Sequence, residues 1–594
     1  MKKRCEVLEK DCWRMEDLFA EDALWEQEYR DAEQKLGAYE KFVGHLGHSA
    51  DMLYACLKFE DALSLQLERL YVYARQKSDE DTGNDTYQSM QARAERLSNQ
   101  AAEKSSFVVP EILSMEEDLL RQYMKSDNGI SHFRLSLERL LAKKEHTLPK
   151  EMEELLAQSY EATQGASLIF NYFNNADIRF PKITNEEGKE EELTHGRFIR
   201  FLESKDQRVR KEAFLSMYQI YRQFSNTLAA TFAANVKQAA FYAKARKYAS
   251  DREAALSANE VPESVYDNLI AAVRKHLPLM HRYVALRKKA LGLDELHMYD
   301  LYVPIVESAG ENIPFETAKE MVKEGLKPLG EEYIAHLQEG FDHRWIDVYE
   351  NEGKRSGAYS WGAYGTHPYV LLNYNGTLDS VFTLAHEMGH ALHSYYSDHA
   401  QPYTYAGYKI FVAEVASTCN ESLLMQDLLK KTEDKKKRAY LLNHFLEMFK
   451  GTLFRQTMFA EFELWAHQAQ ERGEALTAKR LCEKYHRLNV EYFGPQMCVD
   501  EEIDYEWSRI PHFYTPFYVY QYATGISAAI AISRKILSGE EGAREGYFRF
   551  LQGGCSMTPI ALLQLAHVDM NTAKPVEEAL GLFEELLNET EALL

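Results

Sequence analysis

Five consecutive residues, His386 to His390 in the string HEMGH, have the types and the spacing that metal-assisted hydrolysis requires. They lie in VFTLAHEMGHALHSYYSDHA, a segment without proline whose apolar residues recur at helical spacing. On a helix, positions i and i+4 share one face, so both imidazoles can bind one metal ion. Glu387 is rotated by about 100° from His386, which puts it beside the metal, where a base acting on water must be. The pattern is typical of zinc-dependent peptide hydrolases.

A catalytic zinc ion needs a third protein ligand, and two histidines do not supply it. The downstream candidates are His393, His399, Glu414 and Glu421. A longer pattern with a third histidine fails, because Tyr396 occupies that position. Glu414 lies among apolar residues of the helical segment IFVAEVASTCNESLL, where a carboxylate is costly to bury without a partner. We therefore expect Glu414 to bind the metal, Glu421 to orient a ligating histidine, and His393 to pack beside the site.

Length and composition indicate a large globular protein with an acidic surface. The 594 residues are 45% hydrophobic and 27% charged, and the formal net charge is −23. This charge argues against nucleic acid and anionic membranes as partners, since both require basic surfaces. The sequence contains no run of 18 consecutive apolar residues, so no membrane-spanning segment is expected. The seven cysteines are scattered without a C-x-x-C pair, which indicates neither a disulfide framework nor a thiolate zinc site. A reducing compartment, the cytoplasm, is expected.

Helices are expected to supply most of the fold. Between Gly196 and Pro262 the chain contains neither glycine nor proline, and Asp206 can cap one long helix that runs as far as Tyr248. Residues 171–198 are polar instead, and we expect them to form a connection that carries short strands.

The most convincing sheet is expected in residues 343–377, just before the metal-binding helix. Five glycines punctuate short runs rich in tyrosine, valine and tryptophan, and Asn375-Gly376 is a tight-turn signal. A strand beside the metal could pair with an extended peptide through main-chain hydrogen bonds. An ordinary small sheet would have the same sequence, so both interpretations stay open.

Long strings throughout the chain carry a resemblance to a known family. They include HEMGHALHSYYS with FVAEVAST, LTHGRFIRFLES, RKYASDREAALSANEVPESVYDNLI, HPYVLLNYNGT and IPHFYTPFYVYQYATGISAA. These strings resemble the oligoendopeptidase F group of the thimet-oligopeptidase-like zinc peptidases. The resemblance implies a mostly α, multi-helical, two-lobed peptidase with a deep central channel and a small β-sheet beside the zinc helix. It also implies one Zn²⁺ ion, bound by His386, His390 and Glu414, with Glu387 as the general base.

The same resemblance implies three consecutive domains. Residues 1–112 would form an N-terminal helical region, residues 113–190 an oligoendopeptidase F N-terminal domain, and residues 196–590 the zinc peptidase catalytic domain.

An aromatic segment near the C-terminus could supply what the metal site lacks. It contains His512, Tyr514, Tyr518, Tyr520 and Tyr522. Attack on a peptide carbonyl creates an oxyanion, which a phenol or an imidazole can stabilise by donating a hydrogen bond. By the resemblance, His512 takes this role. Tyr520 is the first choice among the tyrosines and Tyr514 the next, whereas Tyr518 and Tyr522 are expected to pack. Without the resemblance, so dense an aromatic group is more often core or interface.

The leading interpretation is an endopeptidase that hydrolyses internal bonds of short oligopeptides, with Glu387 taking a proton from zinc-activated water. One alternative is a dipeptidyl carboxypeptidase on a similar scaffold, which would need a cationic pocket for the terminal carboxylate. Another is a peptide-binding protein that is not a catalyst, and the presence of Glu387 argues against it. The same ligands also accept Mn²⁺ or Co²⁺. Short peptides are the expected partners.

Overall fold

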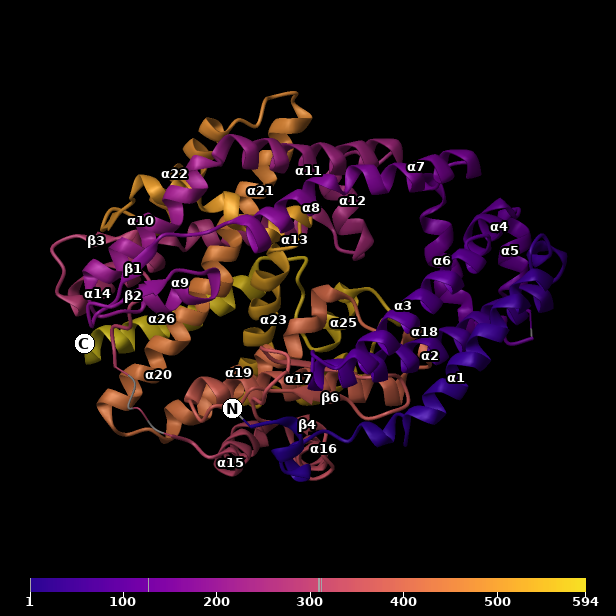
Figure 1. Cartoon of the computed structure of the whole chain (residues 1–594), viewed down its shortest axis with the longest axis horizontal. Coiled ribbons are helices and arrows are strands. Elements are labelled where there is room, and N and C mark those ends of the chain that lie inside the picture. Colours follow the sequence, from indigo (N-terminus) through magenta and orange to yellow (C-terminus); the bar gives the residue numbers. More distant parts are fainter. Residues whose placement is uncertain (1, 127, 308–309, 311) are drawn as a thin grey trace. The chain divides into compact units, whose positions relative to one another are not determined.

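The computed structural model describes residues 2–126, 128–307, 310 and 312–594 (Figure 1). The chain forms two compact units, each built from three separate segments. Unit 1 consists of Met1–Lys150, Gly310–Asp427 and Ile532–His567, and unit 2 of Glu151–Ala309, Leu428–Ala531 and Val568–Leu594. Helices dominate both units and the sheets are small, which confirms the expected mostly helical fold. The three consecutive domains stay a prediction, because the two compact units divide the chain in another way and do not test the predicted boundaries.

Unit 1 contains α1 (Asp22–Lys35), α2 (Ala50–Glu80), α3 (Asp85–Ser105), α4 (Val108–Ser114), α5 (Glu117–Tyr123), α6 (Arg134–Ala142), α15 (Phe315–Leu326), α16 (Glu331–Asp342), α17 (Leu378–Ala400), α18 (Tyr403–Ala406), α24 (Ala543–Leu551) and α25 (Pro559–Leu565). Unit 2 contains α8 (Gly165–Tyr172), α9 (His195–Leu202), α10 (Gln207–Gln223), α11 (Ser225–Ala245), α12 (Asp251–Ala258), α13 (Glu263–Lys275), α14 (Leu277–Leu291), α20 (Lys435–Met448), α21 (Arg455–Glu471), α22 (Ala478–Phe493) and α26 (Lys574–Leu593). The chain passes from one unit into the other along α7 (Lys150–Thr163), α19 (Ile410–Lys431) and α23 (Tyr520–Leu537). Among the helices so described, none is both long and apolar enough to cross a lipid bilayer.

The single long helix predicted from Asp206 onward is wrong, because the structure has two helices, α10 and α11. Asp206 is the N-cap as expected, and its side chain accepts a hydrogen bond from the backbone N–H of Arg208. The break is at Phe224, whose φ of −102° and ψ of 10° leave the helical range. The polar run Ser225–Thr227 follows directly, and such side chains compete with the helix for backbone hydrogen bonds. No glycine or proline marks this break in the sequence.

Two pairs of short strands belong to unit 2. Strands β1 (Lys182–Thr184) and β2 (Glu190–Glu192) pair antiparallel, which confirms the short strands expected in residues 171–198. Strands β3 (Leu296–His297) and β7 (Met497–Cys498) pair parallel. The sequence analysis did not predict this second pair, because two-residue strands leave no periodic signal.

The sheet expected in residues 343–377 is present in unit 1 as three strands. They are β4 (Ile346–Asp347), β5 (Tyr359–Trp361) and β6 (Tyr369–Leu371), in the order β4-β6-β5. Strand β6 is parallel to β4 and antiparallel to β5. Its Tyr369 and Leu371 are buried in the same core as Trp13 and Trp25 from the N-terminal part of the unit. Strand β5 is an edge strand of this sheet.

The turn at Asn375-Gly376 joins the sheet to α17 and so positions the helix that carries His386 and His390. Gly376 has a φ of +81°, and a Cβ atom there would lie 2.2 Å from Oδ1 of Asn312, so only glycine fits. The next residue, Thr377, is the N-cap of α17, and its side chain accepts a hydrogen bond from the N–H of Ser380. The tight turn is confirmed, and it connects a strand to a helix.

Candidate active site

The imidazoles of His386 and His390 lie one turn apart on α17 and face the carboxylate of Glu414 on α19. The Nε2 atoms of the two histidines are 3.2 Å apart. Oε2 of Glu414 lies 3.4 Å from Nε2 of His386 and 3.6 Å from Nε2 of His390. A tetrahedral ion about 2.1 Å from each ligand atom separates those atoms by about 3.4 Å. The triangle therefore fits a divalent metal ion of this size, and α17 and α19 hold its three corners.

Gly389 allows α19 to approach α17 closely enough for this triangle. A Cβ atom at Gly389 would lie 2.6 Å from Cα of Ser417 and 2.9 Å from the carbonyl oxygen of Ala416, which is too close for any other side chain. A buried hydrogen bond also joins the helices, since the Asn420 amide donates to the Ala385 carbonyl over 3.0 Å. The glycine inside the HEMGH string thus has a packing role, and it brings the Glu414 backbone within reach of the histidines.

Glu421 lies on the other side of the His386 ring. Its Oε2 is 3.3 Å from Nδ1 of His386, so Nδ1 can donate to it while the Nε2 lone pair points into the triangle. Burial opposes the charged imidazole, yet Glu421 and Glu414 outweigh burial and raise the pKa of His386 well above its usual range. Burial likewise opposes the Glu414 carboxylate, but the two histidines lower its pKa. The arrangement favours positive charge at this point, as a cation site requires.

Glu387 lies beside the triangle and is not one of its corners. Its side chain is 7% exposed, and Oε2 has no hydrogen-bond partner among the residues that the structure describes. Burial raises the pKa of Glu387, partly offset by the neighbouring histidines. A buried carboxylate with a spare oxygen next to a metal site is placed to accept a proton.

Two further histidines of α17 lie outside the triangle. His393 is 1% exposed and stacks on the ring of Tyr408, with centroids 3.9 Å apart. Burial lowers the pKa of His393 to about 3, so the ring is neutral. His399 directs its Nδ1 to the carbonyl of Tyr395 at 2.7 Å. The converging group on α17 and α19 consists of His386, His390 and Glu414.

His512 lies in unit 2, on the short helical turn η13 (Pro511–Tyr514). Its Nε2 is 3.4 Å from the hydroxyl of Tyr522, and its ring lies nearly parallel to that of Tyr518 at a centroid distance of 5.8 Å. Partial burial lowers the pKa of His512. The tyrosines that adjoin His512 are therefore the two that the sequence analysis expected only to pack.

The two tyrosines favoured by the sequence lie elsewhere in unit 2. Tyr520 is fully buried, with its ring 5.0 Å from that of Tyr266. Tyr514 is half-buried and stacks on Phe170 with centroids 4.2 Å apart. Burial raises the pKa of both phenols, so both stay protonated and can donate. That Tyr520 and Tyr514 contact the substrate stays a prediction.

A buried carboxyl group holds the backbone between His512 and α23. Phe517 has a φ of +54°, a conformation that non-glycine residues rarely adopt. Its N–H donates to Oε1 of Glu463 over 2.7 Å. Glu463 on α21 is completely buried, and burial raises its pKa well above the usual range, with a further contribution from Asp251. Glu463 thus positions the segment that carries His512.

Comparison with known proteins identifies the family. A family model described as "Peptidase family M3" matches residues 200–582, and one described as "Oligopeptidase F" matches residues 111–180. The chain belongs to peptidase family M3. His386, Glu387, His390 and Glu414 all lie within the matched residues 200–582.

Relatives and solved structures that resemble this chain cover 96% to 100% of it. Oligopeptidase PepF of Bacillus subtilis is 50% identical over 591 residues, which span 100% of this chain and 88% of the relative. The crystal structure of oligoendopeptidase-F from Enterococcus faecium is 41% identical with a TM-score of 0.77, covering 96% of this chain and 99% of that one. A crystal structure of a Chlamydophila abortus protein is 35% identical with a TM-score of 0.93 over 100% of both chains.

In this M3 peptidase, sequence reasoning missed an acidic cavity within unit 1. The cavity has a volume of about 650 Å³ and is lined by Asp61, Glu68, Trp361, Ser394, Asp398 and Tyr403, among others. Burial, with a smaller contribution from Glu68, raises the pKa of Asp398 to about 7. The wall includes β5 and the C-terminal half of α17, so the cavity adjoins the helix that carries the histidines. Asp61 and Glu68 come from α2 and Asp398 from α17, and no local motif reveals that they meet.

Proposed function

We propose that this M3 peptidase is a one-zinc endopeptidase of short oligopeptides. The observation that carries the proposal is the triangle of His386, His390 and Glu414 with Glu387 beside it. Two imidazole nitrogens and one carboxylate oxygen are typical donors of a catalytic zinc site that keeps one position open. The relatives named oligopeptidase and oligoendopeptidase support short peptides as substrates.

Each residue has a distinct part in the reaction. When bound, zinc supplies a Lewis acid that polarises the peptide carbonyl and makes water a stronger acid. Glu387 accepts a proton from the attacking water and transfers it to the nitrogen of the leaving amine. Glu421 keeps the His386 ring in the orientation that directs Nε2 to the metal. His512 and a tyrosine donate hydrogen bonds to the oxyanion that forms on the carbonyl oxygen.

Metal removal tests the metal requirement directly. Cleavage of one quenched fluorescent peptide is measured with and without 1,10-phenanthroline, and then after dialysis and addition of Zn²⁺, Mn²⁺ or Co²⁺. We expect the chelator to abolish cleavage and added Zn²⁺ to restore it. Mn²⁺ and Co²⁺ are included because the same donors can bind them as well. Full activity of a chelator-treated, metal-free sample would contradict the proposal.

Product analysis separates endopeptidase action from the dipeptidyl carboxypeptidase alternative. The substrate is a peptide blocked at both ends, and mass spectrometry identifies the fragments. An endopeptidase cleaves the blocked peptide inside the chain, whereas a dipeptidyl carboxypeptidase requires a free carboxyl end. Release of dipeptides from the unblocked form alone would favour the alternative.

The cytoplasm is the proposed location. All seven cysteines are free in the structure, which fits a reducing compartment. The net charge of −23 gives no support to nucleic-acid binding.

A further inference from the structure

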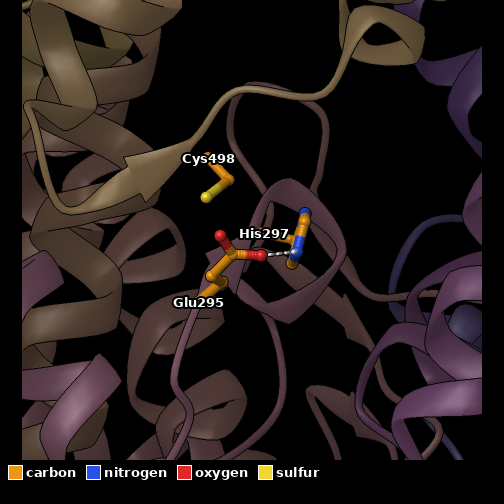
Figure 2. A group of neighbouring side chains, drawn as sticks. All are labelled: Glu295, His297 and Cys498. Atoms are coloured by element: carbon orange, nitrogen blue, oxygen red, sulfur yellow. Dashed lines mark ion pairs between the residues drawn. The ribbon is translucent and has the colours of Figure 1, made fainter.

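Glu295, His297 and Cys498 form a second group of side chains of types that can bind a metal ion, and the group lies entirely within unit 2 (Figure 2). One ligand atom from each side chain lies within 4.8 Å of the ligand atoms of the other two. Nε2 of His297 is 3.7 Å from Oε2 of Glu295. Figure 2 shows the three side chains pointing toward one another from two separate stretches of chain.

The pairing of β3 with β7 explains why these residues meet. His297 is the register partner of Cys498 in this parallel pair, so the two side chains lie side by side. Glu295 lies in a bend just before β3, and its Oε2 approaches Nε2 of His297 to 3.7 Å. The backbone of β3 is anchored as well, because the N–H of His297 donates to Oδ2 of Asp300 over 3.0 Å. Backbone pairing therefore brings His297 and Cys498 together, and Glu295 reaches them from the bend before β3.

Asp500 holds the His297 ring in the orientation that a metal ligand requires. Its Oδ1 lies 2.8 Å from Nδ1 of His297, and its Oδ2 accepts a hydrogen bond from the N–H of Met298 over 2.9 Å. Nδ1 thus donates to Asp500, and the lone pair of Nε2 points toward Glu295 and Cys498. A carboxylate that orients an imidazole in this way is the common arrangement behind a metal-bound histidine. A surface ion pair between His297 and Glu295 would not require it.

We propose that Glu295, His297 and Cys498 bind a second divalent cation, with Zn²⁺ the preferred ion. Thiolate, imidazole and carboxylate together favour a borderline-soft ion over Mg²⁺ or Ca²⁺, which prefer oxygen ligands alone. Oε2 of Glu295 lies 3.7 Å from Nε2 of His297, and the Glu295 side chain, 72% exposed, can rotate in solvent to bring its carboxylate to the ion. Binding releases the thiol proton of Cys498 to solvent.

The bound ion would link β3 to β7, the strand that leads into the segment carrying His512. Strand β7 continues through Asp500 into the helical stretch η12 (Glu501–Arg509) and then into η13. A cation at Cys498 would therefore restrain the start of this segment, and would stabilise unit 2 without taking part in the chemistry. This inference is independent of the proposed peptidase mechanism.

Cobalt substitution tests the site in the full-length protein, because a thiolate bound to Co²⁺ gives an intense charge-transfer band in the near ultraviolet. The triangle on α17 and α19 contains no sulfur, so the band reports the second site alone. The chelator-treated, reduced protein is titrated with Co²⁺, and bound metal per chain is measured in parallel. We expect two ions per chain and a saturable charge-transfer band.

Three variants identify the ligands. Cys498→Ser should lose the band and one of the two ions while retaining peptidase activity. Cys482→Ser, which changes another partly buried cysteine of unit 2, should keep both. Glu414→Ala should keep the band while depleting the metal of the first site. The proposal is overturned if the wild type saturated with Co²⁺ shows no band, or if the band persists in Cys498→Ser.

Glu295→Gln provides a second test of the site in case the Cys498→Ser variant misfolds. The Glu295 side chain is exposed, so this substitution removes a ligand without disturbing the core. We expect the variant to need a Co²⁺ concentration at least about tenfold higher than the wild type before the band appears. Even a residue that only orients a metal ligand contributes about tenfold to metal affinity. An unchanged Co²⁺ affinity would exclude Glu295 from the site.

Discussion

Glu414 and Glu421 project from the same helix, α19, toward the same histidine, but only Glu414 lies within 3.6 Å of the Nε2 atoms of both His386 and His390. Glu421 reaches Nδ1 of His386 instead. Replacing each carboxylate separately by alanine therefore removes a metal ligand in one variant and an orienting partner in the other. The two variants are matched controls, because both truncate a glutamate at a half-buried position of one helix.

The expected loss of metal affinity differs between the variants. The contact from Glu421 to Nδ1 of His386 involves a charged acceptor, and such hydrogen bonds contribute about 1.5–3 kcal/mol. At about 1.4 kcal/mol per tenfold change, Glu421→Ala should weaken zinc binding by roughly 10- to 140-fold. This agrees with the 10- to 100-fold range typical of residues that orient a ligand. Glu414→Ala removes one of three ligand atoms, so its loss should exceed that range and leave the protein metal-free after dialysis.

Zinc affinity is measured by competition with a chelator of known affinity, and metal per chain by elemental analysis after dialysis. Circular dichroism of each variant checks that the helices remain. Glu421→Gln is an additional control, since its amide oxygen can still accept the hydrogen bond from Nδ1 of His386. If Glu421→Ala lost the metal while Glu414→Ala retained it, Glu421 would be the third ligand and the assignment from geometry would be wrong.

Four other predictions follow from the site. Glu387→Gln should retain the metal but lower kcat by about 10²- to 10⁴-fold, and a kcat within tenfold of wild type would remove Glu387 as the base. His512→Ala should lower kcat by about 10²- to 10³-fold with little change in KM, because an oxyanion donor acts in the transition state; an effect on KM alone would refute this role. Burial raises the pKa of Glu463 above its unfolded value of 4.5, so the folded state favours the protonated form. Its contribution to stability is present below pH 4.5 and is lost as pH rises toward the folded pKa, so Glu463→Gln should raise the melting temperature relative to wild type at neutral pH and not at pH 4. A difference in melting temperature that does not vary with pH would contradict this. Asp398→Asn should raise KM for peptides with basic side chains more than for neutral peptides, because it removes a carboxyl group from the acidic cavity; equal changes in KM would exclude the cavity from substrate binding.

Features that depend on local geometry were predictable from the sequence. The i, i+4 spacing of His386 and His390 puts both imidazoles on one helical face whatever surrounds the helix. The Asn375-Gly376 turn and the cap at Asp206 likewise depend on the conformations and side chains of neighbouring residues. The break at Phe224 was missed because no glycine or proline marks it. Local propensity therefore predicted most elements, although not every boundary.

Other features were decided by contacts between distant parts of the chain. The choice between Glu414 and Glu421 depends on how closely α19 approaches α17, which the space above Gly389 permits. The tyrosines that adjoin His512 are Tyr518 and Tyr522, which the fold of unit 2 turns toward it, whereas the family resemblance favoured Tyr520 and Tyr514.

The second metal group depends even more on tertiary structure. Cys498 carries no motif, and its scattered position in the sequence argued against a thiolate site. Only the register of β3 with β7 places it beside His297. Strand pairing across a long stretch of chain depends on the packing of the whole unit, whereas helix periodicity is a property of the segment itself. The sequence by itself therefore predicted the helix that carries His386, Glu387 and His390 and favoured Glu414 as its partner, whereas tertiary structure decided how closely α19 approaches that helix and which cysteine lies beside His297.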